Sequence, residues 1–143
     1  AKQLNGLAIV ILDIDHFKKF NDTYGHALGD KVLVNVAQSL KQVSRDYDQI
    51  ARWGGEEFVI VTRDASPDHL LAYGEKLREK VASSPIFKDD SPDPIFVTIS
   101  LGITQSHLDE SFDDALERAD KALYKSKAKG RNCCTIWLAG EKL

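Results

Sequence analysis

Cysteine is scarce in this chain, because its 143 residues include only Cys133 and Cys134, which are adjacent. Neighbouring side chains in a strand point to opposite faces, so a disulfide between these two would be strained. Their spacing also lacks the intervening residues of a zinc-binding pair. The sequence therefore excludes a disulfide-stabilised fold and a cysteine zinc site, and it predicts reduced thiols in a cytoplasmic protein.

An excess of basic charge is also missing. The net charge is −3 and the isoelectric point is near 5.8, which argues against binding of a nucleic-acid polymer. No apolar run approaches the about 20 residues that a membrane-spanning helix needs. The opening residues, "AKQLNGLAIVILDID", carry one positive charge and an apolar run that ends in acids. That pattern is typical of a buried strand and is a poor signal peptide, so we expect no membrane segment within this chain.

What the chain does contain is an ordinary globular composition, with 43% hydrophobic and 29% charged residues. Its length suits one domain with a single buried core. Neither an internal repeat nor a low-complexity segment is visible. The sequence therefore predicts a single domain over residues 1–143.

Hydrophobic periodicity and turn residues divide this domain into strands and helices. Strands are expected at residues 7–13, 49–53, 58–63, 95–104 and 133–138, helices at 28–43, 66–84 and 111–130, and an exposed loop at 87–94. The segments 49–53 and 58–63 are expected to form a hairpin around "GGEE". With one further helix counted between the first strand and residue 28, the order β-α-α-β-β-α-β-α-β predicts an α/β fold in which helices sandwich a mixed central sheet.

Three acids stand where strands end. Asp13 follows the first apolar run, and Glu56 and Glu57 lie in the hairpin turn. If the hairpin pairs beside the first strand, carboxylates about 4 Å apart would repel by roughly 4 kcal/mol per pair at an effective dielectric of 20. A divalent cation removes that repulsion, and an all-oxygen ligand set suits Mg²⁺ or Mn²⁺.

Phosphate-binding residues accompany these acids. Gly54 and Gly55 permit unusual backbone angles and close approach of an anion. Lys18 follows the first strand, and Lys127 and Arg131 flank the end of the last helix, where they are candidate phosphate donors. Together these residues predict a metal–nucleotide site.

Each signal also has an ordinary structural interpretation. "GGEE" alone is a common hairpin turn, and Asp13 alone is a plausible helix cap. Asn21, His26 and Asp30 taken singly are common turn and cap residues. The functional interpretation is favoured over the structural one because the signals occur together, each at the end of its own helix or strand.

Four segments resemble the GGDEF family of diguanylate cyclases, in that family's order and spacing. They are "DIDHFKKFNDTYGHALGD" at 13–30, "RWGGEEF" at 52–58, "VTISLGI" at 97–103 and "ADKALYKSKAKGRN" at 119–132. The resemblance covers nearly the whole chain. It implies a nucleotide-cyclase-like fold with a ferredoxin-like core, and an enzyme that condenses two GTP into cyclic di-GMP with release of two pyrophosphates.

The resemblance also implies roles for individual residues. Asp13, Glu56 and the main-chain carbonyl of Ile14 would bind Mg²⁺ (or Mn²⁺), with Glu57 beside the metal. Glu56 would be the base for the ribose 3′-hydroxyl, with Lys18 as a further catalytic residue. The implied substrate-binding residues are Asn21 and Asp30 at the guanine edge with His26 nearby, Gly54 and Gly55 in the turn, and Lys18, Lys127 and Arg131 at the β- and γ-phosphates.

Regulation and assembly follow from the same resemblance. Because one chain binds one GTP, a two-fold homodimer would be needed for catalysis. The R-x-x-D pattern of Arg45 and Asp48 resembles an inhibitory site for the product, cyclic di-GMP. A charged, solvated helix end is the ordinary interpretation of that pattern.

The chain departs from the family in lacking the usual N-terminal extension and upstream regulatory domain, which implies an excised catalytic domain. Two other functions remain open. One is a non-catalytic module that senses GTP or cyclic di-GMP and signals to a partner domain, against which the intact acids argue. The other is a cyclase acting within one ATP or GTP molecule, against which Asn21 and Asp30 argue.

Overall fold

The computed structural model describes residues 6–107 and 109–141. Its strands are β1 (Leu7–Ile14), β2 (Gln49–Arg52), β3 (Glu57–Arg63), β4 (Ile86–Phe87), β5 (Pro94–Ile95), β6 (Ile99–Gln105) and β7 (Cys134–Ile136). Its helices are α1 (Phe17–Tyr24), α2 (His26–Val43), α3 (Pro67–Ala82) and α4 (Phe112–Ala128).

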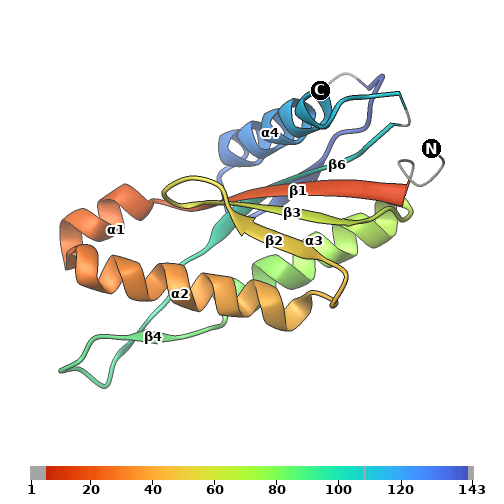
Figure 1. The fold of residues 1–143 in the computed structure, drawn as a ribbon. Helices are drawn as coiled ribbons and strands as arrows, with labels where there is room; N and C mark the ends of the chain where they lie inside the picture. Colours follow the sequence, from red (N-terminus) through yellow and green to blue (C-terminus); the bar gives the residue numbers. More distant parts are fainter. Residues whose placement is uncertain (1–5, 108, 142–143) are drawn as a thin grey trace.

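The main sheet has the order β2-β3-β1-β6-β7, with β1 at its centre (Figure 1). β1 pairs antiparallel with both β3 and β6, while β6 and β7 run parallel. The continuous apolar run of β1 explains its position, since a strand covered on both faces needs apolar side chains at every step. The sheet is mixed, as the sequence predicted.

Helices cover both faces of this sheet (Figure 1). On one face, Val10 and Leu12 of β1 join the main core with residues of α1, α2 and α3. On the other face, Ile9 and Ile11 contact the small residues of α4, such as Ala119. The predicted α/β sandwich is therefore confirmed, and α4 lies alone on its side.

Two predicted segments differ from the structure. The strand expected at 95–104 is divided, because Ile95 pairs with Ile86 in a separate two-stranded sheet and the main-sheet strand begins only at Ile99. The loop expected at 87–94 is therefore the turn of the β4–β5 hairpin, which projects below α2 in Figure 1. The apolar pattern runs through both strands, so the division could not be predicted from that pattern.

Both cysteines are free thiols, in agreement with the sequence. Burial raises the pKa of the Cys134 thiol to about 12, so this thiol stays protonated at neutral pH. Among the helices of the described residues, none is long and apolar enough to cross a membrane.

Candidate active site

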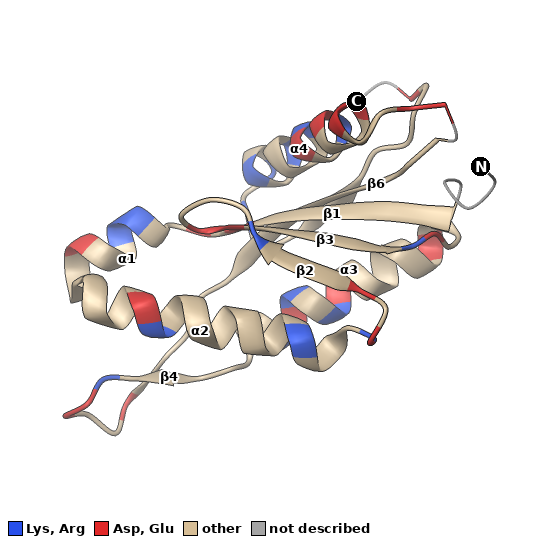
Figure 2. Cartoon of the chain, viewed as in Figure 1, with Lys and Arg blue, Asp and Glu red and all other residues tan. Residues whose placement is uncertain are grey.

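The turn between β2 and β3 lies against the end of β1. Asp13 faces Glu57 across the β1–β3 ladder, and the Ile14 amide donates to the Glu56 carbonyl at 3.2 Å. Figure 2 shows the acidic turn reaching past the end of β1. The three acids thus come together as the sequence predicted from their position at strand ends, and two of them are like charges on opposed strands, a destabilising arrangement by itself.

Hydrogen bonds fix the shape of this turn. The Trp53 amide donates to the Glu57 carbonyl at 2.7 Å. The Arg52 Nε donates to the carbonyls of Gly54 and Gly55 at 3.2 and 3.0 Å, a role that the sequence reasoning missed. Neither glycine has a positive φ, so the expected unusual backbone angles are absent. The space beside both glycines is open, since no atom lies within 4 Å of a Cβ added at either one.

The two turn glutamates are half-buried, and their pKa values are both raised. For Glu56 the main cause is burial, followed by repulsion from Asp13, while Lys127 acts in the opposite direction. For Glu57 the main cause is again burial, followed by repulsion from Asp13 and then Asp120. Both carboxylates are therefore held at a cost that a cation would relieve.

Asp13 already has one cationic partner. Its side chain is 13% exposed, and its Oδ2 accepts a hydrogen bond from Lys127 Nζ. Its Oδ1 is buried and has no hydrogen-bond partner among the described residues. An unpartnered buried carboxylate oxygen is costly, so Asp13 keeps an oxygen whose charge a bound cation would compensate.

The donor set fits a hard divalent cation. Within residues 6–107 and 109–141, however, no three histidine, cysteine or acidic side chains converge as a ready-made metal cluster. A bound metal would therefore need main-chain or phosphate oxygens as further ligands. Mg²⁺ is usually held in this way, by one or two carboxylates together with substrate phosphates and water.

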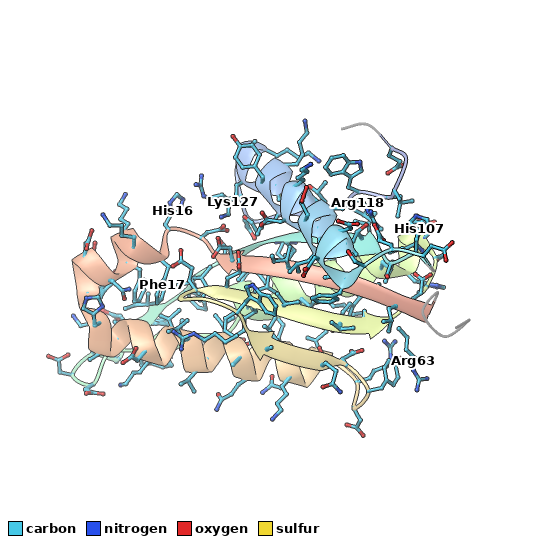
Figure 3. All side chains as sticks on the ribbon, turned by 45° about the horizontal axis from the view of Figure 1, so that its top comes forward. His16, Phe17, Arg63, His107, Arg118 and Lys127 are labelled. Atoms are coloured by element: carbon cyan, nitrogen blue, oxygen red, sulfur yellow. The ribbon has the colours of Figure 1, made fainter. Side chains whose placement is uncertain are left out.

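α4 presents Lys127 to this site. The buried Ser126 donates from Oγ to the Leu101 carbonyl at 2.7 Å and lies 2.7 Å from Thr135 Oγ1, which fixes the last turn of α4 on the sheet. Lys127 consequently lies at the β1–α1 end of the molecule, near His16 and far from Arg63 and His107 (Figure 3). Arg131 follows in an exposed turn with φ of 66°.

The predicted guanine-binding residues lie on the α1–α2 pair. Asn21 is half-buried, and within residues 6–107 and 109–141 its buried Oδ1 has no hydrogen-bond partner. A Cβ added at Gly29 would lie 1.9 Å from that Oδ1, so only glycine leaves room for this carboxamide. His26 and Asp30 are exposed on α2, and Lys18 is exposed in the first turn of α1. The sequence reasoning named these residues and missed Gly29.

Arg45 and Asp48 lie at the opposite end of the β2–β3 hairpin. Arg45 is exposed, whereas Asp48 is only 8% exposed. The Asp48 carboxylate accepts from Thr62 Oγ1, from the Tyr73 hydroxyl at 3.2 Å and from the Arg45 amide at 2.9 Å. Asp48 thus holds the start of β2 in place, while the Arg45 side chain faces outward.

Changing Glu57 to glutamine is expected to stabilise the metal-free chain at pH 7. The change removes a half-buried charge and its repulsion from Asp13, and a gain of about 1 kcal/mol should raise the melting temperature by about 2–4 °C. Because the folded chain raises the pKa of Glu57 above its usual 4.5, the destabilisation is absent below that pH and grows as pH rises through the raised value.

Thermal unfolding in a chelating buffer at pH 4 and pH 7 measures this effect. The gain should appear at pH 7 and vanish at pH 4, and saturating Mg²⁺ should reduce it. A variant less stable than the parent at pH 7 would contradict the assigned repulsion.

Comparisons with known proteins agree with this geometry. The family model "Diguanylate cyclase, GGDEF domain" matches residues 1–133. Diguanylate cyclase A of Treponema denticola is 46% identical over 131 residues, covering 91% of this chain and 35% of that protein. Diguanylate cyclase DgcZ of Escherichia coli is 39% identical over 134 residues, covering 94% of this chain and 44% of that protein. The chain thus spans less than half the length of these two relatives.

Solved structures give the same result. The GGDEF domain of DgcB from Caulobacter crescentus, in complex with c-di-GMP, superposes with a TM-score of 0.85 at 37% identity, covering 91% of this chain and 77% of that one. The active GGEEF domain of a diguanylate cyclase from Vibrio cholerae superposes with a TM-score of 0.81 at 34% identity, covering 93% and 83%. By sequence, fold and the position of its acidic turn, the chain belongs to the GGDEF domain family.

Proposed function

We propose that this domain is a diguanylate cyclase, which joins two GTP molecules into cyclic di-GMP and releases two pyrophosphates. The observation that carries the proposal is the unpartnered Oδ1 of Asp13, which lies beside two half-buried glutamates and Lys127 at one end of the sheet. Relatives named as diguanylate cyclases share this chain's sequence over most of its length.

Asp13, Glu56 and the main-chain carbonyl of Ile14 are the proposed ligands of Mg²⁺ or Mn²⁺, with Glu57 beside them. When bound, the metal would neutralise charge on the phosphates and make the 3′-hydroxyl more acidic. Lys127, now on Asp13, would turn to the β- and γ-phosphates together with Lys18 and Arg131. These cations offset the charge that develops on the departing pyrophosphate.

Glu56 is the proposed base for the ribose 3′-hydroxyl. Burial and the neighbouring Asp13 raise its pKa, which makes its carboxylate a better proton acceptor than an exposed glutamate. The open space at Gly54 and Gly55 would let the triphosphate lie close to the main chain. The 3′-oxygen then attacks the α-phosphorus of the GTP held by a second chain, in line with the leaving pyrophosphate.

Asn21 and Asp30 are the proposed readers of the guanine edge, with His26 in the same pocket. A carboxylate that accepts from the guanine N1–H and N2–H₂ rejects adenine, which offers no such pair of donors there. The buried Oδ1 of Asn21 supports this role, because no donor in the described part of the chain bonds to it and a guanine N–H would satisfy it.

Gly29→Ala is expected to weaken GTP binding by about tenfold and to lower the preference for GTP over ATP, because each lost hydrogen bond to a buried group is worth 1–2 kcal/mol. The added methyl would displace the Asn21 carboxamide rather than main chain, so the fold should survive. Calorimetric titration with both nucleotides measures the change. Gly6→Ala, where no atom lies within 4 Å, is the matched control.

The function itself is tested by incubating the chain at high concentration with GTP and Mg²⁺ and separating the products by chromatography. Cyclic di-GMP with pyrophosphate supports the proposal. Binding of GTP without turnover would indicate a sensing module instead, and a cyclic mononucleotide would indicate cyclisation within one substrate molecule.

Arg45 is the proposed contact for inhibitory cyclic di-GMP, with Asp48 holding the turn behind it. Next to it is a pocket of about 150 Å³ whose lining includes Arg63, His69 and Lys76. Such a cationic lining suits the two phosphates of the product, and an arginine can fork onto a guanine O6/N7 edge.

Arg45→Ala is therefore expected to weaken product inhibition by about tenfold, the loss of one charge-assisted contact, without changing the initial rate. Initial rates measured against added cyclic di-GMP give the inhibition constant. Lys41→Ala, an exposed cation on α2, serves as control. Unchanged inhibition in Arg45→Ala would remove this site from the proposal.

A further inference from the structure

Asp15 is a buried carboxylate for which the proposed mechanism has no use. It is 6% exposed and lies just after β1, two residues beyond Asp13. Its Oδ1 accepts from Ser100 Oγ at 2.6 Å, and its Oδ2 accepts from Thr98 Oγ1 at 2.7 Å and from the Asn132 amide at 3.0 Å. Because every contact is a donor within the protein, this carboxylate is not placed to bind a metal.

One of these donors belongs to an unusual turn. Gly130, Arg131 and Asn132 have φ values of 117°, 66° and 50°, so three successive residues are in the left-handed region. For Arg131 this conformation is strained and persists only where the surroundings impose it, whereas asparagine, as at Asn132, adopts it more readily. The Arg131 amide donates a hydrogen bond to the Ser126 carbonyl in the last turn of α4, at 3.1 Å.

Three contacts hold Asn132, the last residue of this turn. Its amide donates to Asp15 Oδ2 at 3.0 Å and to Ser100 Oγ at 3.2 Å, and its Oδ1 accepts from Arg78 at 3.0 Å. The Arg78 guanidinium is itself oriented by Glu75. Arg131 is exposed, and it lies between the end of α4 and Asn132, which these hydrogen bonds hold in place. Of these hydrogen bonds, only the one to Asp15 connects the turn to the end of β1.

We propose that Asp15 is a positioning residue for the triphosphate. It holds the 130–132 turn in its left-handed conformation and so sets Arg131 at a fixed place relative to Asp13 and the acidic turn. The inference rests on the proposed function, because it takes Arg131 to bind the β- and γ-phosphates. A turn held in one conformation loses less conformational entropy on binding than a mobile one, so Asp15 increases the affinity for the triphosphate without touching it.

A double-mutant cycle tests this role. Affinities for GTP and for GMP are measured by calorimetry with Mg²⁺ for the parent chain, Asp15→Ala, Arg131→Ala and the double variant. We expect Asp15→Ala to weaken GTP binding by about tenfold, the loss of one oriented guanidinium contact, and to leave GMP binding unchanged. In the Arg131→Ala background, Asp15→Ala should have no further effect.

Two further variants serve as controls for this test. Asp15→Asn keeps an acceptor for the Asn132 amide and should remain within about threefold of the parent. Glu110→Gln removes a carboxylate that is also well buried, 13% exposed in its pair with Arg118, from beside the other end of α4. It should lower thermal stability without changing either affinity. If Asp15→Ala does not fold, Thr98→Val removes one donor to the same Oδ2 and takes its place.

The outcomes separate this inference from the proposed function. Equal losses of GTP affinity in both backgrounds, equal losses for GTP and GMP, or no loss at all would each overturn the positioning role. Because the readout is binding, a parent chain that binds GTP but forms no cyclic di-GMP would fail the proposed function and leave this inference standing.

Discussion

Replacing Glu56 with glutamine is expected to lower the rate of cyclic di-GMP formation by at least about 10³-fold while GTP still binds, because it removes both a metal ligand and a base. The change keeps the size of the side chain. The Glu56 backbone carbonyl still accepts from the Ile14 amide, so the turn keeps its place beside β1. The loss should therefore fall on turnover rather than on folding.

The measurement pairs product chromatography with calorimetric titration of GTP. Glu117→Gln, which removes an exposed carboxylate from α4, is the control and should keep full activity. Full turnover in Glu56→Gln would refute the assignment of this residue as metal ligand and base. A failure of both variants to bind GTP would instead point to a damaged fold, which circular dichroism would reveal.

Much of the fold was predictable because its signals are local. The apolar run of β1, the paired glycines between two strands and the capping serine of α3 each determine their element within a few residues. The division of the segment 95–104 was not predictable, since β5 and β6 pair with different partners and only pairing distinguishes them.

The candidate site was likewise predictable where its signals are local and not where they depend on distant segments. Asp13, Glu56 and Glu57 were predicted together because each stands at the end of a strand, and neighbouring strands bring such ends together. Asp15, Arg52 and Gly29 were missed because their importance depends on contacts from other segments: the Asn132 amide, the turn carbonyls and the Asn21 carboxamide. A sequence pattern reports the residue, but not the partner that comes from a distant element.

Dimerisation should control activity more strongly than any surface substitution. Within residues 6–107 and 109–141, the proposed phosphate cations and the Asn21–Asp30 pair each occur once, so under the proposed function another copy would present the second GTP. At concentrations where the chain is monomeric, the rate per chain should rise in proportion to protein concentration. Fusion to a dimeric coiled coil should raise it by at least about 10²-fold, because a tethered partner is present at millimolar effective concentration.

Rates measured at several dilutions, with light scattering to give the monomer fraction, check this expectation. The fused Glu56→Gln variant controls for the tether and should stay inactive. A purely monomeric chain whose rate per chain does not change on dilution would show that both nucleotides bind to one copy. The same chain would then need a second triphosphate-binding site, made from residues other than Lys18, Lys127 and Arg131.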